Sequence, residues 1–313
     1  MMPDELMPDT LMIEQVIEAA RVSWSLGDAP ISLVAARENR VYRVDGSDGP
    51  SALRLHRQGY RSNEEIHSEL QWMEMLAANS MSVPKPIPAQ DGTFVKTING
   101  VVVDMLSWVD GVPLAKTEVT SDNYNELGCL LARMHKLHDQ WELPSGFSRP
   151  TWDLVGEQPL WGRFWDNPGL TQEQRERFLQ FRDTARSALD AMDQPDFGLI
   201  HADLVPDNIL IDGKQLHLID FDDGGFGHRL FDLATITHRS RRKNGNDELA
   251  DATVAGYCTV RSLQCDALPL FEAMRACSYI GWNISRMDEA GGQERNARFI
   301  AEAETALEKF HRS

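Results

Sequence analysis

The stretch from His201 to Asp223, HADLVPDNILIDGKQLHLIDFDD, constrains the fold more than any other part of the chain. It contains two short apolar runs on either side of an Asp212-Gly213 pair. An Asp-Gly pair between two apolar runs is a strong signal for a β-hairpin. Such a hairpin turns the chain back, so Asp220 at the end of the second run returns to the level of Asn208 at the start of the first.

Three oxygen-bearing side chains are expected to meet at the open end of this hairpin: Asp203, Asn208 and Asp220. Amide and carboxylate oxygens suit Mg²⁺, which keeps its other coordination positions for phosphate and water. A carboxylate outside the metal shell can accept a proton from a hydroxyl group. The order of a carboxylate, an asparagine and a second carboxylate along the chain is that of the kinase catalytic loop and metal site.

The composition is that of an ordinary globular protein, with 313 residues, 42% of them hydrophobic and 25% charged. A net charge of -17 repels nucleic acid phosphates, so no nucleic acid partner is expected. No apolar run approaches the roughly 20 residues needed to span a bilayer, and no membrane partner is expected. The N-terminal MMPDELMPDT lacks the basic and apolar segments of a secretory signal, which indicates a cytoplasmic location.

The periodicity of apolar residues divides the chain into two parts. The first part is predicted to be an antiparallel sheet of four or five strands with one helix over 63–78, because its strands are joined by short Gly-containing turns. The second part is predicted to be mostly helical, with a helix capped by Thr120 or Ser121 and another that begins with a capping box at Thr171 and Gln174. Further helices are expected near 229–239, 247–260, 268–288 and from about Glu294.

The chain resembles the protein-kinase-like phosphotransferases in these motifs. HADLVPDNIL is similar to their His-x-Asp-x-x-x-x-Asn loop, and LIDFDDGGFGHRLFDLA to their metal-binding aspartate followed by a helix with a structural aspartate, here Asp232. The resemblance is strongest to aminoglycoside phosphotransferases, type II homoserine kinases, choline kinases and stress-response kinase A. It implies an α+β, two-lobed fold, with a small N-terminal lobe over 1–106, a hinge over 107–111 and a helical lobe over 112–313.

The resemblance also implies roles for individual residues. Asp203 would be the catalytic base, and Asn208 and Asp220 the Mg²⁺ ligands. ATP would lie between the lobes, with the backbones of Ser107 and Val109 against adenine. The family usually has a lysine that pairs ATP phosphates with a helix glutamate; in this chain Arg54 takes that place, and Glu69 fits the glutamate. The phosphate-covering loop, AARENR, has no glycine.

The expected acceptor is a small molecule with a hydroxyl group and an amine, because the acidic surroundings would repel a carboxylate unless an arginine such as Arg229 or Arg286 compensates. The sequence is also compatible with a homodimer. Three alternatives stay open. The first is a protein Ser/Thr kinase. The second is a nucleotide-binding pseudokinase, which Arg54 suggests, and the third is a two-metal phosphohydrolase, which the aspartate cluster suggests.

Other residues of these motifs are expected to have structural roles. His201 is predicted to be a buried, hydrogen-bonded scaffold, and Asp232 to orient the loop. We expect Asp222 and Asp223 to be solvated carboxylates of a turn, with a position of one of them near the metal as the alternative. The tryptophans of TWDLVGEQPLWGRFW are expected to pack in the core, or else to form a cage for a quaternary ammonium group; they are Trp152, Trp161 and Trp165.

Overall fold

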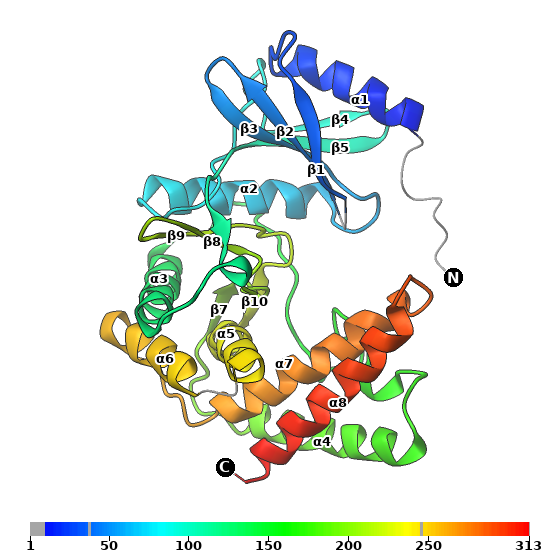
Figure 1. Ribbon diagram of the computed structural model, residues 1–313, viewed down its shortest axis with the longest axis vertical. Coiled ribbons are helices and arrows are strands. Elements are labelled where there is room, and N and C mark those ends of the chain that lie inside the picture. Colours follow the sequence, from blue (N-terminus) through cyan, green and yellow to red (C-terminus); the bar gives the residue numbers. More distant parts are fainter. Residues whose placement is uncertain (1–9, 37–38, 245–246, 313) are drawn as a thin grey trace.

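The computed structural model describes residues 10–36, 39–244 and 247–312, without the side chains of 242–244. The first part of the chain forms a five-stranded antiparallel sheet in the order β1-β2-β3-β5-β4 (Figure 1). Its strands are β1 (Ile31–Ala36), β2 (Arg40–Gly46), β3 (Gly49–Leu55), β4 (Val95–Ile98) and β5 (Val101–Ser107). The predicted hairpins over β2–β3 and β4–β5 are both present, with left-handed glycines in their turns at Gly49 and Gly100.

Two helices lie on opposite faces of this sheet, where we had predicted one (Figure 1). The predicted helix is α2 (Asn63–Ala78), which begins with a capping box between Ser62 and Glu65. The additional helix is α1 (Thr10–Ser23), whose buried side chains pack with the sheet in a small apolar core. The buried side chains of α2 belong instead to the larger core of the rest of the chain. Helix α2 therefore joins the sheet to the helical part.

The second part of the chain is mostly helical, as predicted. Its helices are α3 (Ser121–Gln140), α4 (Gln172–Asp190), α5 (Arg229–Asn244), α6 (Glu248–Val260), α7 (Leu268–Asn283) and α8 (Gly292–Phe310). The predicted caps at Thr120 and Thr171 are both present. Three 3₁₀ turns lie among these helices, at Leu114–Lys116, Phe164–Asp166 and Ile284–Arg286. The last of them replaces the end of the helix that we had expected to continue to 288.

Short strands carry the loops between these helices. The predicted hairpin is formed by β8 (Ile209–Asp212) and β9 (Gln215–Leu218), and β6 (Val112–Pro113) pairs with β8. A second small sheet, which the sequence did not predict, pairs β7 (Phe197–Ile200) with β10 (Gly225–His228). These strands place 201–208 and 219–224, the two loops with the predicted site residues, under α2 (Figure 1).

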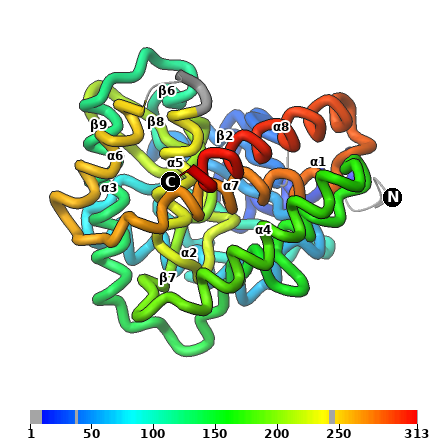
Figure 2. The backbone as a smooth tube through the Cα atoms, turned by 90° about the horizontal axis from the view of Figure 1, so that it is seen from below, coloured from blue at the N-terminus to red at the C-terminus, as the bar shows by residue number. Residues whose placement is uncertain are grey.

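Seen along the molecule from below, α5 and α7 lie between the α3–α6 pair and the α4–α8 pair (Figure 2). The mixed architecture, with an antiparallel sheet followed by a helical part, confirms the predicted fold class. Within the described residues no helix has both the length and the apolar character to cross a membrane. The N-terminal MMPDELMPDT, which lacks the features of a secretory signal, lies almost wholly in residues 1–9, outside the described part.

Two glycines allow α3 and α6 to pack backbone against backbone. A Cβ atom on Gly128 would lie 2.0 Å from the carbonyl oxygen of Thr253, and one on Gly256 would lie 2.0 Å from that of Asn125. Real Cβ atoms do not approach a carbonyl oxygen so closely. Any side chain at either position must therefore push the two helices apart.

We expect Gly128→Ala to lower the free energy of unfolding by about 1–3 kcal/mol, because the added methyl group overpacks this contact. Urea unfolding followed by circular dichroism measures the change. Gly46→Ala is the control, since a Cβ there meets only the carbonyl oxygen of Gly49 at an ordinary 3.5 Å. Equal stability of the two variants would show that α3 and α6 can separate at no cost.

Candidate active site

The open end of the β8–β9 hairpin brings together the residues predicted to form the site. Asn208 lies just before β8, and its Nδ2 donates to the carbonyl oxygen of Asp203 at 2.9 Å and to its carboxylate Oδ2 at 3.0 Å. After β9, the N–H of Ile219 donates to the carbonyl oxygen of Asn208 at 3.0 Å. The chain therefore brings Asp220 back to the level of Asn208, as the turn predicts.

A buried carboxylate on α5 fixes the loop that carries Asp203. The two carboxylate oxygens of Asp232 accept the N–H of His201 at 2.8 Å and that of Ala202 at 2.7 Å. Ala202 has a φ of 67°, in the left-handed region, which costs a non-glycine residue about 1–3 kcal/mol. The hydrogen bonds to Asp232 hold the backbone in this conformation.

The imidazole of His201 supports the same loop from within the core. The ring is fully buried, and its Nε2 donates to the carbonyl oxygen of Ile219 at 3.0 Å. Burial lowers the pKa of His201, so the ring is neutral near pH 7. His201 thus links the loop of Asp203 to the residue before Asp220, and both His201 and Asp232 lie where a scaffold role requires.

Asp220 is a carboxylate with unfavourable electrostatic surroundings. It also has a left-handed backbone, with a φ of 67°. Desolvation of the carboxyl group, followed by the nearby carboxylates of Asp203 and Asp223, raises its pKa to about 7, although Asp220 as a residue is exposed to solvent. Arg54 acts in the opposite direction but does not cancel this effect. A cation bound here would remove the imbalance.

Arg54 is held in a buried network that is larger than the predicted pair. Its Nη1 donates to Glu69 on α2 at 2.7 Å, which confirms that these two side chains pair. Its Nε and Nη2 also form a fork-to-carboxylate contact with Asp104, its cross-strand neighbour on β5, at 2.8 and 2.7 Å. His56 contacts the same carboxylate at 2.8 Å.

Asp104 is the member of this network that the sequence analysis missed. Burial alone would raise the pKa of Asp104, but the charges of Arg54 and His56 outweigh it and hold that pKa well below its usual range. The guanidinium of Arg54 is therefore fixed from two sides by carboxylates. The sequence feature that could have revealed Asp104 is that it is the single acid within the apolar strand VVVDMLS.

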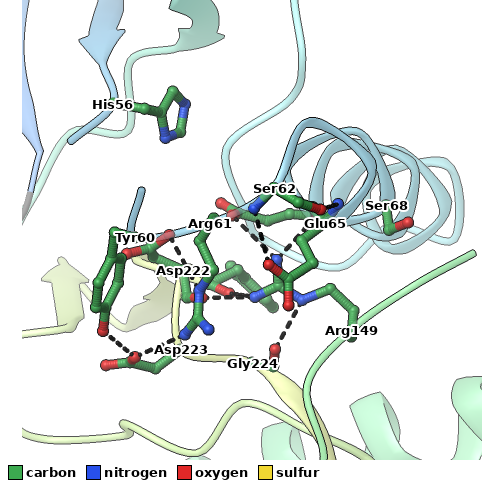
Figure 3. Close-up of polar contacts among 12 residues, drawn as sticks. His56, Tyr60, Arg61, Ser62, Glu65, Ser68, Arg149, Asp222, Asp223 and Gly224 are labelled. Carbon is green, nitrogen blue, oxygen red and sulfur yellow. Dashed lines mark hydrogen bonds and ion pairs between the residues drawn. The ribbon is translucent and has the colours of Figure 1, made fainter. Parts of the chain in front are cut away.

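Two further buried arginines fix the loop after Asp220 (Figure 3). The guanidinium of Arg149 donates to four backbone carbonyl oxygens: Gly224 at 2.7 Å, Phe221 at 3.0 Å, Asp222 at 2.6 Å and Glu65 at 2.9 Å. Three of these belong to the loop, and the fourth belongs to α2. Arg149 therefore joins the loop to the helix that supports Glu69.

Arg61 and Tyr60 hold the acidic side chains of this loop (Figure 3). The Oδ1 of Asp223 accepts from the Tyr60 hydroxyl at 2.9 Å and from Nη2 of Arg61 at 3.0 Å, while Nε of Arg61 donates to the carbonyl oxygen of Asp222. The side chains of Asp222 and Asp223 are only 7% and 17% exposed. The prediction that they are solvated turn carboxylates is wrong, because residues distant in sequence enclose the turn.

One of the three tryptophans predicted to pack in the core or to form a cation cage contacts an arginine of the same chain. Trp152 and Trp165 are buried in the main core, which confirms the packing prediction for them. Trp161 faces the guanidinium of Arg275, whose central carbon lies 4.9 Å from the ring centre. The same guanidinium donates to Oδ1 of Asp203 at 2.7 Å.

The two arginines proposed to compensate an acceptor carboxylate are placed differently. Arg229 is buried and pairs with Asp139 at 2.7 Å and with Asp196 at 3.3 Å, so its charge is already balanced by these acids. Arg286 stacks over Trp282, with 4.1 Å from its central carbon to the ring centre. Arg229 is therefore not a candidate for binding an acceptor.

The segment predicted to face adenine follows β5. The N–H of Ser107 donates to the carbonyl oxygen of Lys85 at 2.7 Å, so this group is not available to a purine. The other backbone groups of the segment, including those of Val109, are therefore the ones left to bind adenine. This adenine contact stays a prediction. Two residues of the phosphate-covering loop, Arg37 and Glu38, lie outside the described part of the chain.

The described residues contain no group of three or more His, Cys, Asp or Glu side chains that could hold a metal ion. The candidate pair of Asn208 and Asp220 combines an amide with a carboxylate. Because the Nδ2 of Asn208 is bound to Asp203, its amide oxygen is the atom left for a cation. Two hard oxygen donors fit Mg²⁺, which takes its remaining ligands from phosphate and water.

Comparison with known proteins decides the family. The model of a family described as "Phosphotransferase enzyme family" matches residues 31–276. The chain belongs to this family. A homoserine kinase of Rhizobium johnstonii (strain DSM 114642 / LMG 32736 / 3841) is 32% identical over 243 residues, which cover 74% of this chain and 73% of that protein. Amicoumacin kinase of Bacillus subtilis (strain 168) is 26% identical over 233 residues, or 72% and 67% of the two chains.

A solved structure extends the similarity to nearly the whole chain. The structure of a microcompartment-associated aminopropanol kinase has a TM-score of 0.81 and 29% identity, and the match covers 95% of this chain and 96% of the other. The predicted kinase-like fold and phosphotransferase class are confirmed. These named relatives are small-molecule kinases, which supports ATP-dependent phosphotransfer to a small molecule.

We expect Arg149→Lys to lower the free energy of unfolding by about 2–4 kcal/mol, because a lysine cannot reach all four carbonyl oxygens and leaves buried acceptors unsatisfied. The same change should weaken Mg²⁺-dependent ATP binding, since the loop next to Asp220 loses its support. Urea unfolding and calorimetric titration measure the two effects.

Arg186→Lys is the matched control, because the pair of Arg186 and Asp153 lies at the surface, with side chains 34% and 48% exposed. It should change stability by less than about 0.5 kcal/mol. If both substitutions had equally small effects, the loop would not depend on Arg149.

Proposed function

We propose that this phosphotransferase moves the γ-phosphate of ATP to a hydroxyl group of a small, amine-bearing molecule. The observation that carries the proposal is the grouping of Asp203, Asn208 and Asp220 at the end of one hairpin. The named relatives support the substrate class, since homoserine and aminopropanol both carry an amine and a hydroxyl group.

Asp203 has the role of base in this proposal. The acceptor oxygen forms a bond to the γ-phosphorus, the bond from that phosphorus to the β–γ bridging oxygen breaks, and the hydroxyl proton passes to the carboxylate of Asp203. An aspartate is a weak base, and the transition state of phosphoryl transfer is loose. Orientation of the hydroxyl by Asp203 therefore matters more than its basicity.

Asn208 and Asp220 would hold Mg²⁺ through the amide oxygen and the carboxylate. When bound, Mg²⁺ neutralises charge on the β- and γ-phosphates of ATP. Arg54, fixed by Glu69 and Asp104, would face the phosphates with its guanidinium. Ser107 and Val109 would line the adenine site in a hinge over 107–111, between an N-terminal lobe over 1–106 and a helical lobe over 112–313.

The charge around the site favours an acceptor with an amine. The carboxylates of Asp203, Asp220 and Asp223 act on one another, and burial and Asp203 together raise the pKa of Asp223. An ammonium group on the acceptor would be attracted to these acids, whereas an acceptor with only a carboxylate would be repelled. Salt would screen the attraction where the site is open to solvent.

We expect amino alcohols to be phosphorylated at least about tenfold more efficiently, in kcat/KM, than matched alcohols without the amine; this ratio corresponds to ~1.4 kcal/mol. The measurement is transfer from γ-labelled ATP to pairs such as aminopropanol and propanediol, with choline, ethanolamine, homoserine, aminoglycosides and Ser/Thr peptides in the same panel.

Asp203→Asn is the negative control for this panel, because loss of the base should lower turnover by about 10²–10⁴-fold. Equal transfer to propanediol and aminopropanol would contradict the role of the amine. Transfer to peptides alone would replace the proposal with a protein kinase, and binding of ATP with no transfer to any acceptor would indicate a pseudokinase.

A further inference from the structure

Arg275 of α7 is a fully buried arginine that contacts the predicted catalytic loop directly. Its Nη2 donates to Oδ1 of Asp203 at 2.7 Å, and its Nη1 donates to the carbonyl oxygen of Ala202 at 3.0 Å. Its Nε donates to the hydroxyl of Tyr279, one turn further along α7, at 3.0 Å. Every nitrogen of the guanidinium therefore has an acceptor.

Aromatic rings surround the same guanidinium. Its central carbon lies 4.4 Å from the ring centre of Tyr279, 4.9 Å from that of Trp161 and 5.3 Å from that of Phe231. Rings at these distances attract a cation and exclude water from it. A guanidinium buried in this way has a single arrangement, because any other rotamer would leave its charge desolvated and unpaired.

The contact fixes the orientation of the Asp203 carboxylate. Oδ1 is bound by Arg275, and Oδ2 is bound by Nδ2 of Asn208 at 3.0 Å. Each oxygen keeps a further lone pair, so the carboxylate can still accept a proton. The planar fork of Arg275 also binds the carbonyl oxygen of Ala202, the residue with the left-handed backbone. A lysine ammonium does not have the fork geometry for these two acceptors.

We propose that Arg275 is a positioning residue, which sets the orientation of the Asp203 carboxylate toward the acceptor hydroxyl. The inference rests on the proposed function, in which Asp203 is the base. The side chain of Asp203 is 23% exposed, whereas Arg275 is fully buried. The exposed end of the pair therefore faces the reactants, and the buried end holds it in place.

Arg239 offers a matched control within the same cluster. Its Nε also donates to the Tyr279 hydroxyl at 3.0 Å, and its central carbon lies 4.5 Å from the Tyr279 ring centre. Its described contacts do not include Asp203 or Ala202. Arg239→Met and Arg275→Met thus each remove one guanidinium from Tyr279, but only the second removes a contact to the catalytic loop.

The test is a double-mutant cycle with Arg275→Met and Asp203→Asn, together with Arg239→Met, read out as kcat and as KM for ATP. Arg275→Met should lower kcat by about 10–10²-fold, since a misplacement of about 1 Å can cost this much. KM for ATP should change by less than about threefold, because Arg275 acts on the acceptor side. Arg239→Met should keep wild-type kcat.

The cycle also separates this inference from the proposed function. In the Asp203→Asn background, Arg275→Met should lower kcat by less than about threefold, because the group on which it acts is already lost. Full additivity, or a folded Arg275→Met enzyme with wild-type kcat, would overturn the role of Arg275 alone. Wild-type kcat in Asp203→Asn by itself would overturn the base assignment.

Arg275→Lys keeps the test decisive if Arg275→Met does not fold. It retains the charge and most of the side-chain volume but loses the fork, so kcat should still fall by about tenfold. Circular dichroism and thermal unfolding confirm the folded state. A folded Arg275→Lys enzyme with wild-type kcat would refute the positioning role, because it would show that charge and packing suffice.

Discussion

Repulsion among carboxylates is the physical constraint on which the site depends. Asp203, Asp220, Asp222, Asp223 and Glu69 act on one another at close range, and such groups cannot all be ionised without compensating cations. The chain supplies these cations as buried arginines. Arg54 pairs with Glu69 and Asp104, Arg61 with Asp222 and Asp223, and Arg275 with Asp203.

These arginines leave Asp220 and Asp222 incompletely compensated, since the pKa of each is raised to about 7. For Asp220, desolvation of the carboxyl group and then the carboxylates of Asp203, Asp223 and Glu69 raise the pKa, and Arg54 lowers it without cancelling them. Two buried arginines hold the loops of the site, since Arg275 binds the loop of Asp203 and Arg149 binds the loop after Asp220. Hydrogen bonds therefore fix the geometry of the site, while part of its negative charge is not compensated by the arginines. A site that binds a divalent cation together with a polyphosphate requires both properties.

The sequence predicted the parts of the site that depend on local patterns. The Asp212-Gly213 turn determined the return of the chain to Asn208, and the predicted caps at Thr120 and Thr171 marked helix starts. Helix α1 was missed, although Ile13, Val16 and Ala20 have helical spacing. Arg149 and Arg275 could not be predicted, because their partners lie about 70 residues away in the chain and only the tertiary fold brings them together. The wrong prediction for Asp222 and Asp223 has the same cause, since turn acids are usually solvated unless distant arginines enclose them.

Calorimetric titration of ATP, with and without Mg²⁺, into the wild-type enzyme and into Asp220→Asn tests the central claim most directly. The substitution keeps the size of the side chain and removes the uncompensated charge. We expect Mg²⁺ to strengthen ATP binding by at least about tenfold in the wild type, or ~1.4 kcal/mol, and by less than about twofold in Asp220→Asn. The same enhancement by Mg²⁺ in both proteins would contradict this claim.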